Sequence, residues 1–398
     1  MSETTAENQP ERLIVKNFGP LKDVNIELKD IMVFIGPQAS GKSTLAKTLL
    51  MIFSEYHKVT RGDTAVKEHE KFLADANIDF LTKDTKIEFL RNGGSIYRLD
   101  GNHPLVSYPK LNADLETKEK VKQLLEKQEV KLDSRIDILT YVKILSPNIL
   151  TPIKAELELL LGRLSINPAY IPAERNIISN LSDSIMGVLA KGVSIPKFIL
   201  DFGGKFEDAR NELKKTSIDF LNITYEYNFA TGNRIFISPK QSISLAEAAS
   251  GMQSVIPLYL VVKHFAKSDL LVIEEPELNL FPEAQKKLVE FIIEACRDKT
   301  KTLIITTHSP YILTVLNNLI QAHNVVKERP ELEEEVNKII PKERWLDFDK
   351  VGVYYVADGT AKNIMYEKNR IIKAENLDSV SKNLSNEFGQ LLDLQYGD

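Results

Sequence analysis

The amino-acid sequence predicts an α/β protein with a mixed, mainly parallel central sheet, an antiparallel β subdomain and a helical insertion. Residues 31–35, 269–275 and 301–308 predict buried strands, and the run at 31–35 is continuously apolar, which is typical of a strand that is buried on both faces. Helical patterns follow the first two of these strands, at 42–53 and 281–298. This alternation of buried strands and helices is typical of a parallel sheet covered by helices.

The first half of the chain adds strands near the N-terminus and then helices. Residues 12–35 predict three short strands, of which the last is a buried apolar run. Residues 85–101 predict a β-hairpin that turns at 92–94, where Asn-Gly-Gly favours a tight turn. From 111 to 145, charged residues and apolar residues at helical spacing predict helices, and helical patterns continue from 152 to about 215. The charges of 111–145 predict a solvated face, with a partner or DNA surface as the alternative.

The second half of the chain contains another hairpin and a polar loop. Residues 223–239 predict a hairpin that turns at 231–233. The small polar residues "SGMQS", at 250–254, precede an apolar run that predicts a buried helix. Pro282 lies in the first turn of the next predicted helix, a position that suits proline.

The composition is that of a globular protein and gives no overall signal for nucleic acid. Of 398 residues, 43% are hydrophobic and 27% charged, and the net charge is −5. The single cysteine, Cys296, lies in a helical pattern and excludes an intramolecular disulfide. The N-terminus lacks the apolar region of a signal peptide, and no apolar run reaches the roughly 18 residues of a membrane span. We therefore expect a cytoplasmic protein.

A phosphate-binding loop is predicted by "GPQASGKST", which matches G-x-x-x-x-G-K-[ST] at every fixed position. It follows a buried strand and precedes a helix, as this motif requires. The glycines let backbone N–H groups surround phosphates, and the helix N-terminus adds partial positive charge. We expect Lys42 to reach the β- and γ-phosphates of ATP and Ser43 to bind Mg²⁺; a ligand-free turn is the alternative. The predicted nucleotide-binding residues are Gly36, Pro37, Gln38, Ala39, Ser40, Gly41, Lys42, Ser43 and Thr44.

Two adjacent glutamates end the buried strand at 269–275. Ligands of parallel α/β sheets bind at the carboxyl edge of the strands, and adjacent strand residues point to opposite faces. One carboxylate can then serve Mg²⁺ while the other faces the attacking water. We assign Glu274 to the metal and Glu275 to the general base, with a solvated acidic turn as the alternative.

A histidine ends the next apolar strand, in "TTHSP". Beside a phosphate site, His308 can hydrogen-bond the γ-phosphate or the attacking water. The alternative is a structural histidine. The expected catalytic residues are therefore Lys42, Glu275 and His308.

The four motifs "GPQASGKS", "SGMQS", "VIEEPE" and "TTHSP", in this order, resemble the head of an ABC-type ATPase, a P-loop NTPase. In that family "SGMQS" resembles the signature loop, which binds ATP held by a different subunit, and two heads enclose two nucleotides. The residues Ser250, Gly251 and Gln253 match the signature positions. The resemblance implies that Ser250 and the N–H of Gly251 cap the γ-phosphate of the partner. An N-cap serine at a helix start is the alternative, and it is compatible with this role.

Other features resemble one branch of that class. About 230 residues separate Lys42 from Glu274, whereas transporter heads are more compact and carry a glutamine loop soon after the first motif. The start "LIVKNFGPLKDVNIEL" resembles SMC, RecF and OLD-like heads. Most ABC proteins have aspartate at the position that Glu274 occupies here, whereas "EEPE" is similar to OLD-like ATPases. The segment "IPAERN" also resembles stand-alone members of the OLD-like group. Its Arg175 is either a phosphate contact or a structural ion pair, and we favour the ion pair.

The end of the chain differs from the OLD nucleases, whose TOPRIM domain carries a glutamate and then an Asp-x-Asp pair. About 90 residues follow His308, and Asp358 precedes a glycine in a pattern that predicts a hairpin turn. We therefore expect no nuclease on this chain.

The resemblance implies an ATPase that uses ATP and Mg²⁺ and forms a head-to-tail homodimer, or a higher homo-oligomer, on ATP. By analogy with stand-alone ATPases of the Septu and PARIS type, we expect a separately encoded nuclease or other effector in bacterial anti-phage defence. A DNA repair or recombination ATPase of RecF/SMC type, which holds DNA, is the main alternative; the head of a membrane transporter is the second. The expected domains are an ATPase lobe at 1–110, a helical insertion at 111–215, and a part at 216–398 with the signature, acidic pair, histidine and C-terminal hairpin and helices.

Overall fold

The structure is a computed structural model. It describes residues 10–59, 73–75, 80–91, 94–101, 103–106, 115–130, 168–181, 195–264, 268–297, 300–373, 386–391 and 394–395. Within these ranges, no helix has the length and apolar character needed to cross a membrane.

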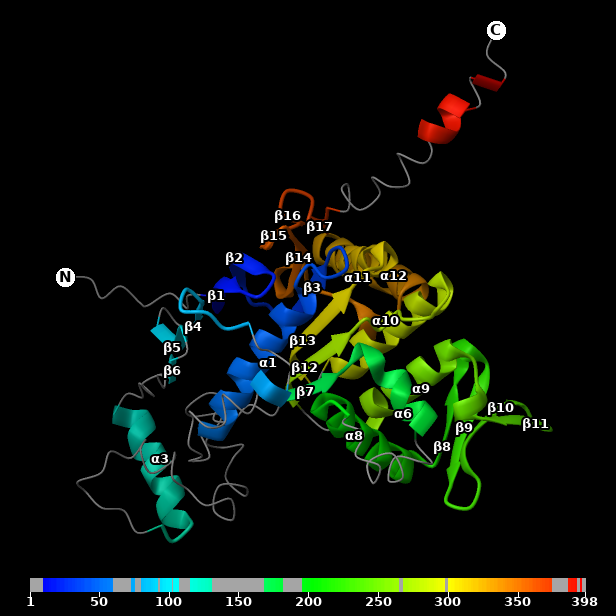
Figure 1. Ribbon diagram of the computed structural model, residues 1–398, viewed down its shortest axis with the longest axis horizontal. Coiled ribbons are helices and arrows are strands. Elements are labelled where there is room, and N and C mark those ends of the chain that lie inside the picture. The colour runs from blue at the N-terminus through cyan, green and yellow to red at the C-terminus, as the bar shows by residue number, and fades with distance from the viewer. Residues whose placement is uncertain are drawn as a thin grey trace.

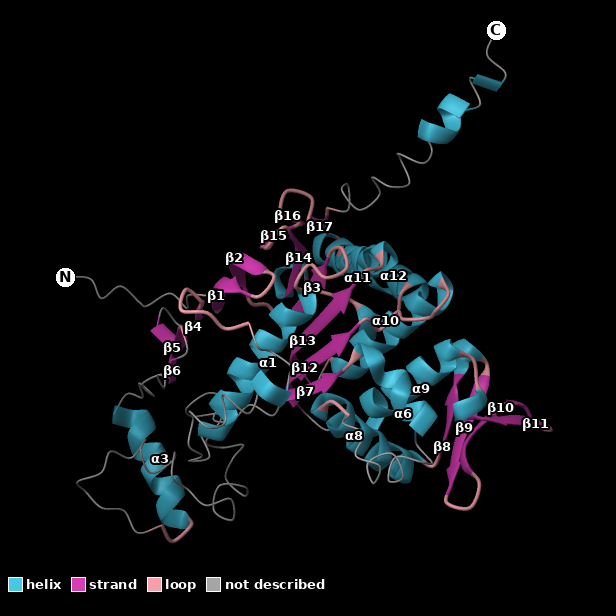
Figure 2. Ribbon diagram, viewed as in Figure 1, coloured by secondary structure: helices cyan, strands magenta, loops and turns pink. Residues whose placement is uncertain are grey.

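A large mixed sheet forms the centre of the molecule (Figure 1, Figure 2). Its strands are β1 (Arg12–Phe18), β2 (Leu21–Glu27), β3 (Ile31–Ile35), β4 (Lys86–Arg91), β5 (Gly94–Asp100), β6 (His103–Val106), β7 (Pro168–Ile171), β12 (Ser268–Glu274), β13 (Thr300–Thr307), β14 (Val351–Ala357) and β15 (Thr360–Asn363). In the described part of the chain their order is β6-β5-β4-β1-β2-β15-β14-β3-β13-β12-β7. From β14 to β7 every pair of neighbours is parallel, which confirms the predicted parallel sheet.

The antiparallel side of the sheet comes from the N-terminal strands. Strands β6, β5, β4, β1 and β2 pair antiparallel in that order, which confirms the predicted strands of 12–35 and the hairpin of 85–101. Of the predicted turn at 92–94, residues 92 and 93 lie outside the described residues, whereas Gly94 belongs to β5 and pairs with Arg91. Strands β14 and β15 form the predicted hairpin around Asp358, since Ala357 pairs with Thr360.

Helices cover both faces of the parallel strands (Figure 1). The described helices are α1 (Lys42–Val59), α3 (Leu115–Lys127), α6 (Asn176–Leu181), α8 (Lys197–Leu213), α9 (Ser250–His264), α10 (Pro282–Cys296), α11 (Pro310–Glu328) and α12 (Glu333–Ile339). Of these, α1 packs on one face of the parallel strands, and α8, α9, α10 and α11 pack on the other. Alternate residues of β3 enter two cores. Met32 and Phe34 pack in a cluster with α1, whereas Val33 and Ile35 pack in a cluster with α8, α9, α10 and α11. Burial on both faces explains why β3 is continuously apolar.

A second, antiparallel sheet has the order β11-β10-β9-β8. Its strands are β8 (Lys215–Ile218), β9 (Ile223–Asn228), β10 (Gly232–Ser238) and β11 (Gln241–Ser244). The predicted hairpin at 223–239 is confirmed, but its turn is 229–231 and not 231–233, because Gly232 pairs with Asn228. Asn233 belongs to the strand because its side chain is buried and accepts a hydrogen bond from the Tyr225 hydroxyl.

The predicted helical region also contains one strand of the central sheet. Helices α3, α6 and α8 lie within it, but its break at 168–171 is β7, which pairs in parallel with β12. Residues 131–167 and 182–194 of this region lie outside the described residues. Towards the C-terminus, two short strands, β16 (Met365–Tyr366) and β17 (Ile371–Ile372), pair with each other.

Candidate active site

The phosphate loop, residues 36–41, joins β3 to α1 at the carboxyl edge of the parallel strands. Gly36 is required there, because a Cβ atom would lie 2.1 Å from the Val356 carbonyl oxygen of β14. The Lys42 side chain is buried and donates to the carbonyl oxygens of Gly36 (3.0 Å) and Pro37 (2.7 Å). Burial lowers the pKa of Lys42, and the charge of Glu275 acts in the opposite direction. The lysine is therefore held at the mouth of the loop, among carboxylates.

The other predicted residues of the loop lie on its outer side. Pro37, Gln38 and Ala39 are exposed, whereas Ser40 is half-buried. The Ser40 hydroxyl oxygen is buried and has no hydrogen-bond partner in the described part of the chain. The loop passes into α1 as the Leu45 N–H donates to the Gly41 carbonyl (2.8 Å). The exposed part of the loop is open to a ligand from solvent.

Glu274 is the last residue of β12 and is 4% exposed. Burial raises the pKa of its carboxyl group, while the charge of Lys47 and hydrogen bonds from the Tyr170 and Ser43 hydroxyls act in the opposite direction. Its Oε1 atom is buried without a hydrogen-bond partner among the described residues. A buried carboxylate with a free oxygen beside a serine hydroxyl fits the oxygen ligands that Mg²⁺ prefers. Ser43 and Glu274 therefore fit the metal role predicted for them.

Tyr170 is a residue of this site that we do not predict from the sequence. It lies on β7, beside β12, and hydrogen-bonds Glu274. Burial raises the pKa of its hydroxyl group well above the usual value, and the charge of Glu274 raises it further. Tyr170 therefore remains a neutral donor. No sequence signal places β7 next to β12.

Glu275 is oriented by a turn and not by strand alternation. It follows the end of β12 and has a φ of 41°, in the left-handed region that few residues other than glycine adopt. Its N–H donates to the Thr306 carbonyl on β13 (2.9 Å), which fixes this backbone. Our expectation that the two glutamates alternate along one strand is therefore wrong, although their side chains still lie in different surroundings.

His308 lies between the other two predicted catalytic residues. Strand β13 ends at Thr307, one residue earlier than predicted, and His308 follows it. The Nε2 atom of His308 lies 3.1 Å from Glu275 Oε1, and its Nδ1 atom lies 3.4 Å from Lys42 Nζ. The structure therefore joins Lys42, His308 and Glu275 in one chain of contacts.

Glu277, the last glutamate of "EEPE", holds the histidine loop in place. It is 8% exposed, and its Oε1 atom accepts hydrogen bonds from the Thr307 hydroxyl (2.5 Å) and the His308 N–H (2.9 Å). Burial raises the pKa of Glu277, and these two hydrogen bonds act in the opposite direction. The only signal for this role in the sequence is the third carboxylate of the motif, to which we assign no role there.

The segment "SGMQS" is the start of α9 and not a loop. Ser250 is exposed at this helix N-terminus, while Gln253 is buried and donates to the Ala246 carbonyl (2.7 Å). Gly251 packs against the loop after the acidic pair, since a Cβ atom would lie 2.6 Å from the Asn279 carbonyl oxygen. The segment therefore presents Ser250 outward and Gln253 inward.

Within the described part of the chain, Ser250 and Gly251 make no hydrogen bond or ion pair with Lys42, Glu275 or His308. The side chains of the predicted catalytic residues thus contact one another within one polypeptide, whereas the predicted signature residues take no part in these contacts.

Arg175 makes neither of the contacts considered from the sequence, a phosphate contact or an ion pair. It is fully buried, which rules out a phosphate contact at the surface. Within the described ranges, its hydrogen bonds go to backbone carbonyls, including those of Glu274 and Glu275 (both 2.8 Å), and not to a carboxylate. The favoured ion pair is therefore wrong, although the role is structural.

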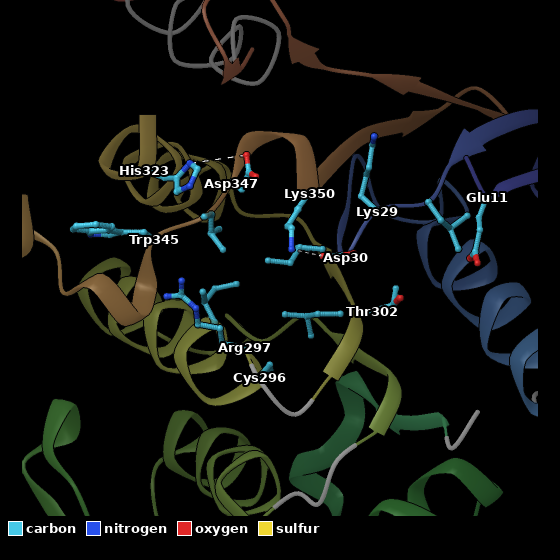
Figure 3. A pocket seen from close by; sticks show the side chains of 15 residues that line it. Glu11, Lys29, Asp30, Cys296, Arg297, Thr302, His323, Trp345, Asp347 and Lys350 are labelled. Carbon is cyan, nitrogen blue, oxygen red and sulfur yellow. Dashed lines mark ion pairs between the residues drawn. The ribbon is translucent and has the colours of Figure 1, made fainter. Parts of the chain in front are cut away.

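A cavity of about 820 Å³ lies at the other edge of the sheet (Figure 3). It is lined by Ile31, the first residue of β3, and by Leu303, which pairs with Ile31 on β13. An ion pair between Lys350 and Asp30 (3.4 Å) lies in its wall. None of the predicted site residues lines it. This cavity is therefore separate from the candidate active site.

Comparison with known proteins gives one family match and several structural similarities. A family model described as an AAA ATPase domain matches residues 11–313. The SMC head domain from Thermotoga maritima has a TM-score of 0.38 and 12% identity, over 90% of this chain and 99% of that chain. A Pyrococcus furiosus Smc head bound to the C-terminal domain of ScpA has a TM-score of 0.35 and 11% identity, over 94% and 98%. An ABC-transporter ATP-binding cassette in its ADP conformation has a TM-score of 0.33 and 14% identity, over 88% and 89%. No curated protein matches the chain.

Proposed function

The chain belongs to the AAA ATPase domain family and is an ATPase, and we propose that it hydrolyses ATP as an ABC-type head with Lys42, Glu275 and His308 as its catalytic residues. The observation that carries this proposal is the placement of His308 between Glu275 (3.1 Å) and Lys42 (3.4 Å). General base, orienting residue and phosphate-binding lysine are thereby held together at the carboxyl edge of the sheet, where such sheets bind ligands.

Each side chain has a role that follows from its surroundings. Lys42 binds the β- and γ-phosphates and offsets their charge. Glu275 accepts the proton of the attacking water, and His308 orients its carboxylate. Ser43 and Glu274 are the residues that would hold Mg²⁺, whose chemistry is to neutralise charge on the phosphates. The hydrogen bonds of Glu277 to Thr307 and His308 keep the histidine in place.

The second part of the proposal is a head-to-tail homodimer that forms on ATP. It is supported by the exposed Ser250 at the N-terminus of α9, where backbone N–H groups and partial positive charge suit a phosphate. Ser250 and Gly251 lie outside the contacts of their own chain's catalytic residues. A nucleotide held by the phosphate loop of a second copy would complete both sites.

The third part is control of a separately encoded nuclease in anti-phage defence. It is supported by the resemblance of "EEPE" and "IPAERN" to stand-alone OLD-like ATPases and by the absence of an Asp-x-Asp pair after Asp358 in the sequence. The test is purification of the protein from its native operon, with mass measurement of what co-elutes. A nuclease supports the proposal, whereas repair proteins or a permease contradict it.

The hydrolytic core of the proposal is tested with the full chain alone. Steady-state release of phosphate from ATP and Mg²⁺ is measured for the wild type and for Lys42→Ala. The wild type should hydrolyse ATP and the variant should not, because it lacks the cation that binds the phosphates. Equal turnover of the two proteins would reject the site.

A further inference from the structure

Arg175 is a fully buried cation whose hydrogen bonds, among the residues that the structure describes, all go to the backbone. It ends a short 3-10 helix, Ala173–Arg175, that follows β7. Its guanidinium group donates to the carbonyl oxygens of Pro172 (3.1 Å), Ser254 (3.0 Å), Glu274 (2.8 Å), Glu275 (2.8 Å) and Pro276 (3.3 Å). Since the acceptors are backbone atoms, the arginine fixes the course of the chain and not the side chains.

These acceptors belong to two functional segments. Nε donates to Ser254, in the second turn of α9, which begins with the exposed Ser250. Nη1 and Nη2 donate to Glu274 and Glu275, in the segment that carries the predicted metal ligand and general base. One rigid, planar group therefore spans the start of α9 and this acidic segment, which we name the hydrolysis loop (274–277).

A second contact joins the same two segments. Gly251, in the first turn of α9, lies so close to the Asn279 carbonyl oxygen that a Cβ atom would be 2.6 Å away. The start of α9 thus packs directly against the chain that follows the hydrolysis loop. A displacement of α9 cannot leave that loop unaffected, because the contact has no room and the Arg175 bonds have fixed geometry.

The guanidinium group of Arg175 remains charged despite its burial, and its shape suits the backbone acceptors around it. Burial lowers the pKa of Arg175 to about 10, while the charges of Glu277, Glu275 and Glu274 act in the opposite direction, so the group stays protonated at neutral pH. Arginine offers five N–H donors in a planar fork, whereas lysine offers three donors from a single nitrogen. A lysine at this position keeps the charge but cannot reach both segments in the same way.

We propose that Arg175 is a positioning residue that couples the start of α9 to the hydrolysis loop, so that nucleotide contact at Ser250 and Gly251 sets the position of Glu275. This inference rests on the proposed function, since it takes Glu275 as the general base and α9 as the contact to the partner's nucleotide. When α9 contacts ATP that is bound to the second subunit, it would thereby align Glu275 of the subunit to which α9 belongs.

The test compares Arg175→Lys with the wild type in the full chain. If the substitution misaligns Glu275 but leaves the phosphate loop intact, kcat should fall by roughly 10²-fold, and the affinity for ATP should change by less than about threefold. The matched control is Arg234→Lys, because Arg234 also donates to a backbone carbonyl, that of Ser242, but lies in the second sheet. The control should keep the kcat of the wild type.

Two outcomes of this comparison overturn the inference. A folded Arg175→Lys with the kcat of the wild type removes the positioning role. Equal losses of ATP affinity and kcat indicate general damage and not positioning. The proposed function fails in a different way, namely if the wild type does not hydrolyse ATP or if Glu275→Gln keeps normal turnover.

Arg175→Lys can be compared with the wild type only if it is folded, which a cooperative unfolding transition shows. If it is not folded, hydrogen exchange on the wild type tests the same coupling. A non-hydrolysable ATP analogue should slow amide exchange together at 250–254 and 274–277, because one side chain ties both segments. Protection of only one of the two segments would contradict the inference.

Discussion

The Nε2 atom of His308 lies 3.1 Å from Oε1 of Glu275, while its Nδ1 atom lies 3.4 Å from the ammonium group of Lys42. A lysine ammonium group only donates, so Nδ1 accepts and Nε2 carries the proton that it donates to the carboxylate. The histidine therefore holds the carboxylate of Glu275, the proposed general base, in one orientation. The backbone N–H of His308 donates to Glu277 (2.9 Å), which fixes the backbone that carries the ring.

Removal of the general base should stop hydrolysis and preserve binding. We expect Glu275→Gln to lower kcat by roughly 10²–10⁴-fold, since amide cannot accept the proton of the attacking water. The variant should bind ATP and remain dimeric with it for longer, as measured by light scattering. The exposed Glu283 on α10 gives the matched control, Glu283→Gln, which should keep full turnover. Near-normal turnover in Glu275→Gln would transfer the role to another residue.

Removal of the histidine should have a smaller effect. The loss of one hydrogen bond to a charged group is equivalent to about 1.5–3 kcal/mol, so His308→Ala should lower kcat by roughly 10–10²-fold. His323 is the matched control, because it lies beside Asp347 in the wall of the cavity at the other edge of the sheet. His323→Ala should retain the turnover of the wild type. Equal losses in the two variants would indicate an effect on folding and not on the site.

The charge of Glu277 should make stability depend on pH. Burial raises its pKa in the folded state above the usual 4.5, so the folded protein resists ionisation more than the unfolded chain does. The stability gained from the protonated form is present below about pH 4.5 and is lost as pH rises through the folded pKa. Glu277→Gln has no such charge and can still accept the hydrogen bonds of Thr307 and His308.

The measurement is the Tm of the wild type and of Glu277→Gln from pH 4.5 to 8. The wild type should lose Tm relative to the variant as the pH rises. Glu277→Ala, which loses both hydrogen bonds, should be less stable at every pH, by about 1–3 kcal/mol. A difference between wild type and Glu277→Gln that stays constant across this range would contradict the buried charge.

Mixing two inactive variants tests whether each site is shared between subunits. Lys42→Ala removes the phosphate-binding cation, and Ser250→Arg places a bulky cation where the partner's γ-phosphate should be capped. In a mixed dimer with shared sites, one site carries both changes and the other carries neither. Mixing should therefore restore hydrolysis, up to about half of the wild-type activity per heterodimer.

ATP-dependent formation of the heterodimer must be measured in the same samples. Heterodimers that form readily but never hydrolyse ATP would argue against independent shared sites. If ATP promotes no dimer at all, the role of Ser250 as part of a signature is wrong.

The chain alone should not cleave DNA. Plasmid or phage DNA incubated with pure protein, ATP and Mg²⁺ or Mn²⁺ should remain intact, because Asp358 lies in a hairpin turn between β14 and β15 with no Asp-x-Asp pair after it. Cleavage that co-purifies with the protein and disappears in Asp358→Ala would contradict this expectation.

Much of the fold follows from local patterns in the sequence. The buried runs at β3, β12 and β13 predict parallel strands because their residues pack in two cores, one on each face. The pattern of "GPQASGKST" predicts the loop before α1, since the glycine that approaches Val356 closely belongs to the motif itself. The turn predicted at 231–233 lies at 229–231, because the buried Asn233 belongs to β10 and fixes the register of β10 against β9.

The sequence by itself determined the order of the motifs, the strands that carry them and the residue types able to bind phosphate and move a proton, because these depend on neighbours along the chain. The tertiary structure decided which side chains meet. Arg175 and Glu274 are 99 residues apart, and their contact exists because β7 pairs with β12. Tyr170 reaches Glu274 through the same pairing, and Glu277 reaches His308 because β12 and β13 are neighbours. Such contacts depend on strand order, which no local pattern encodes.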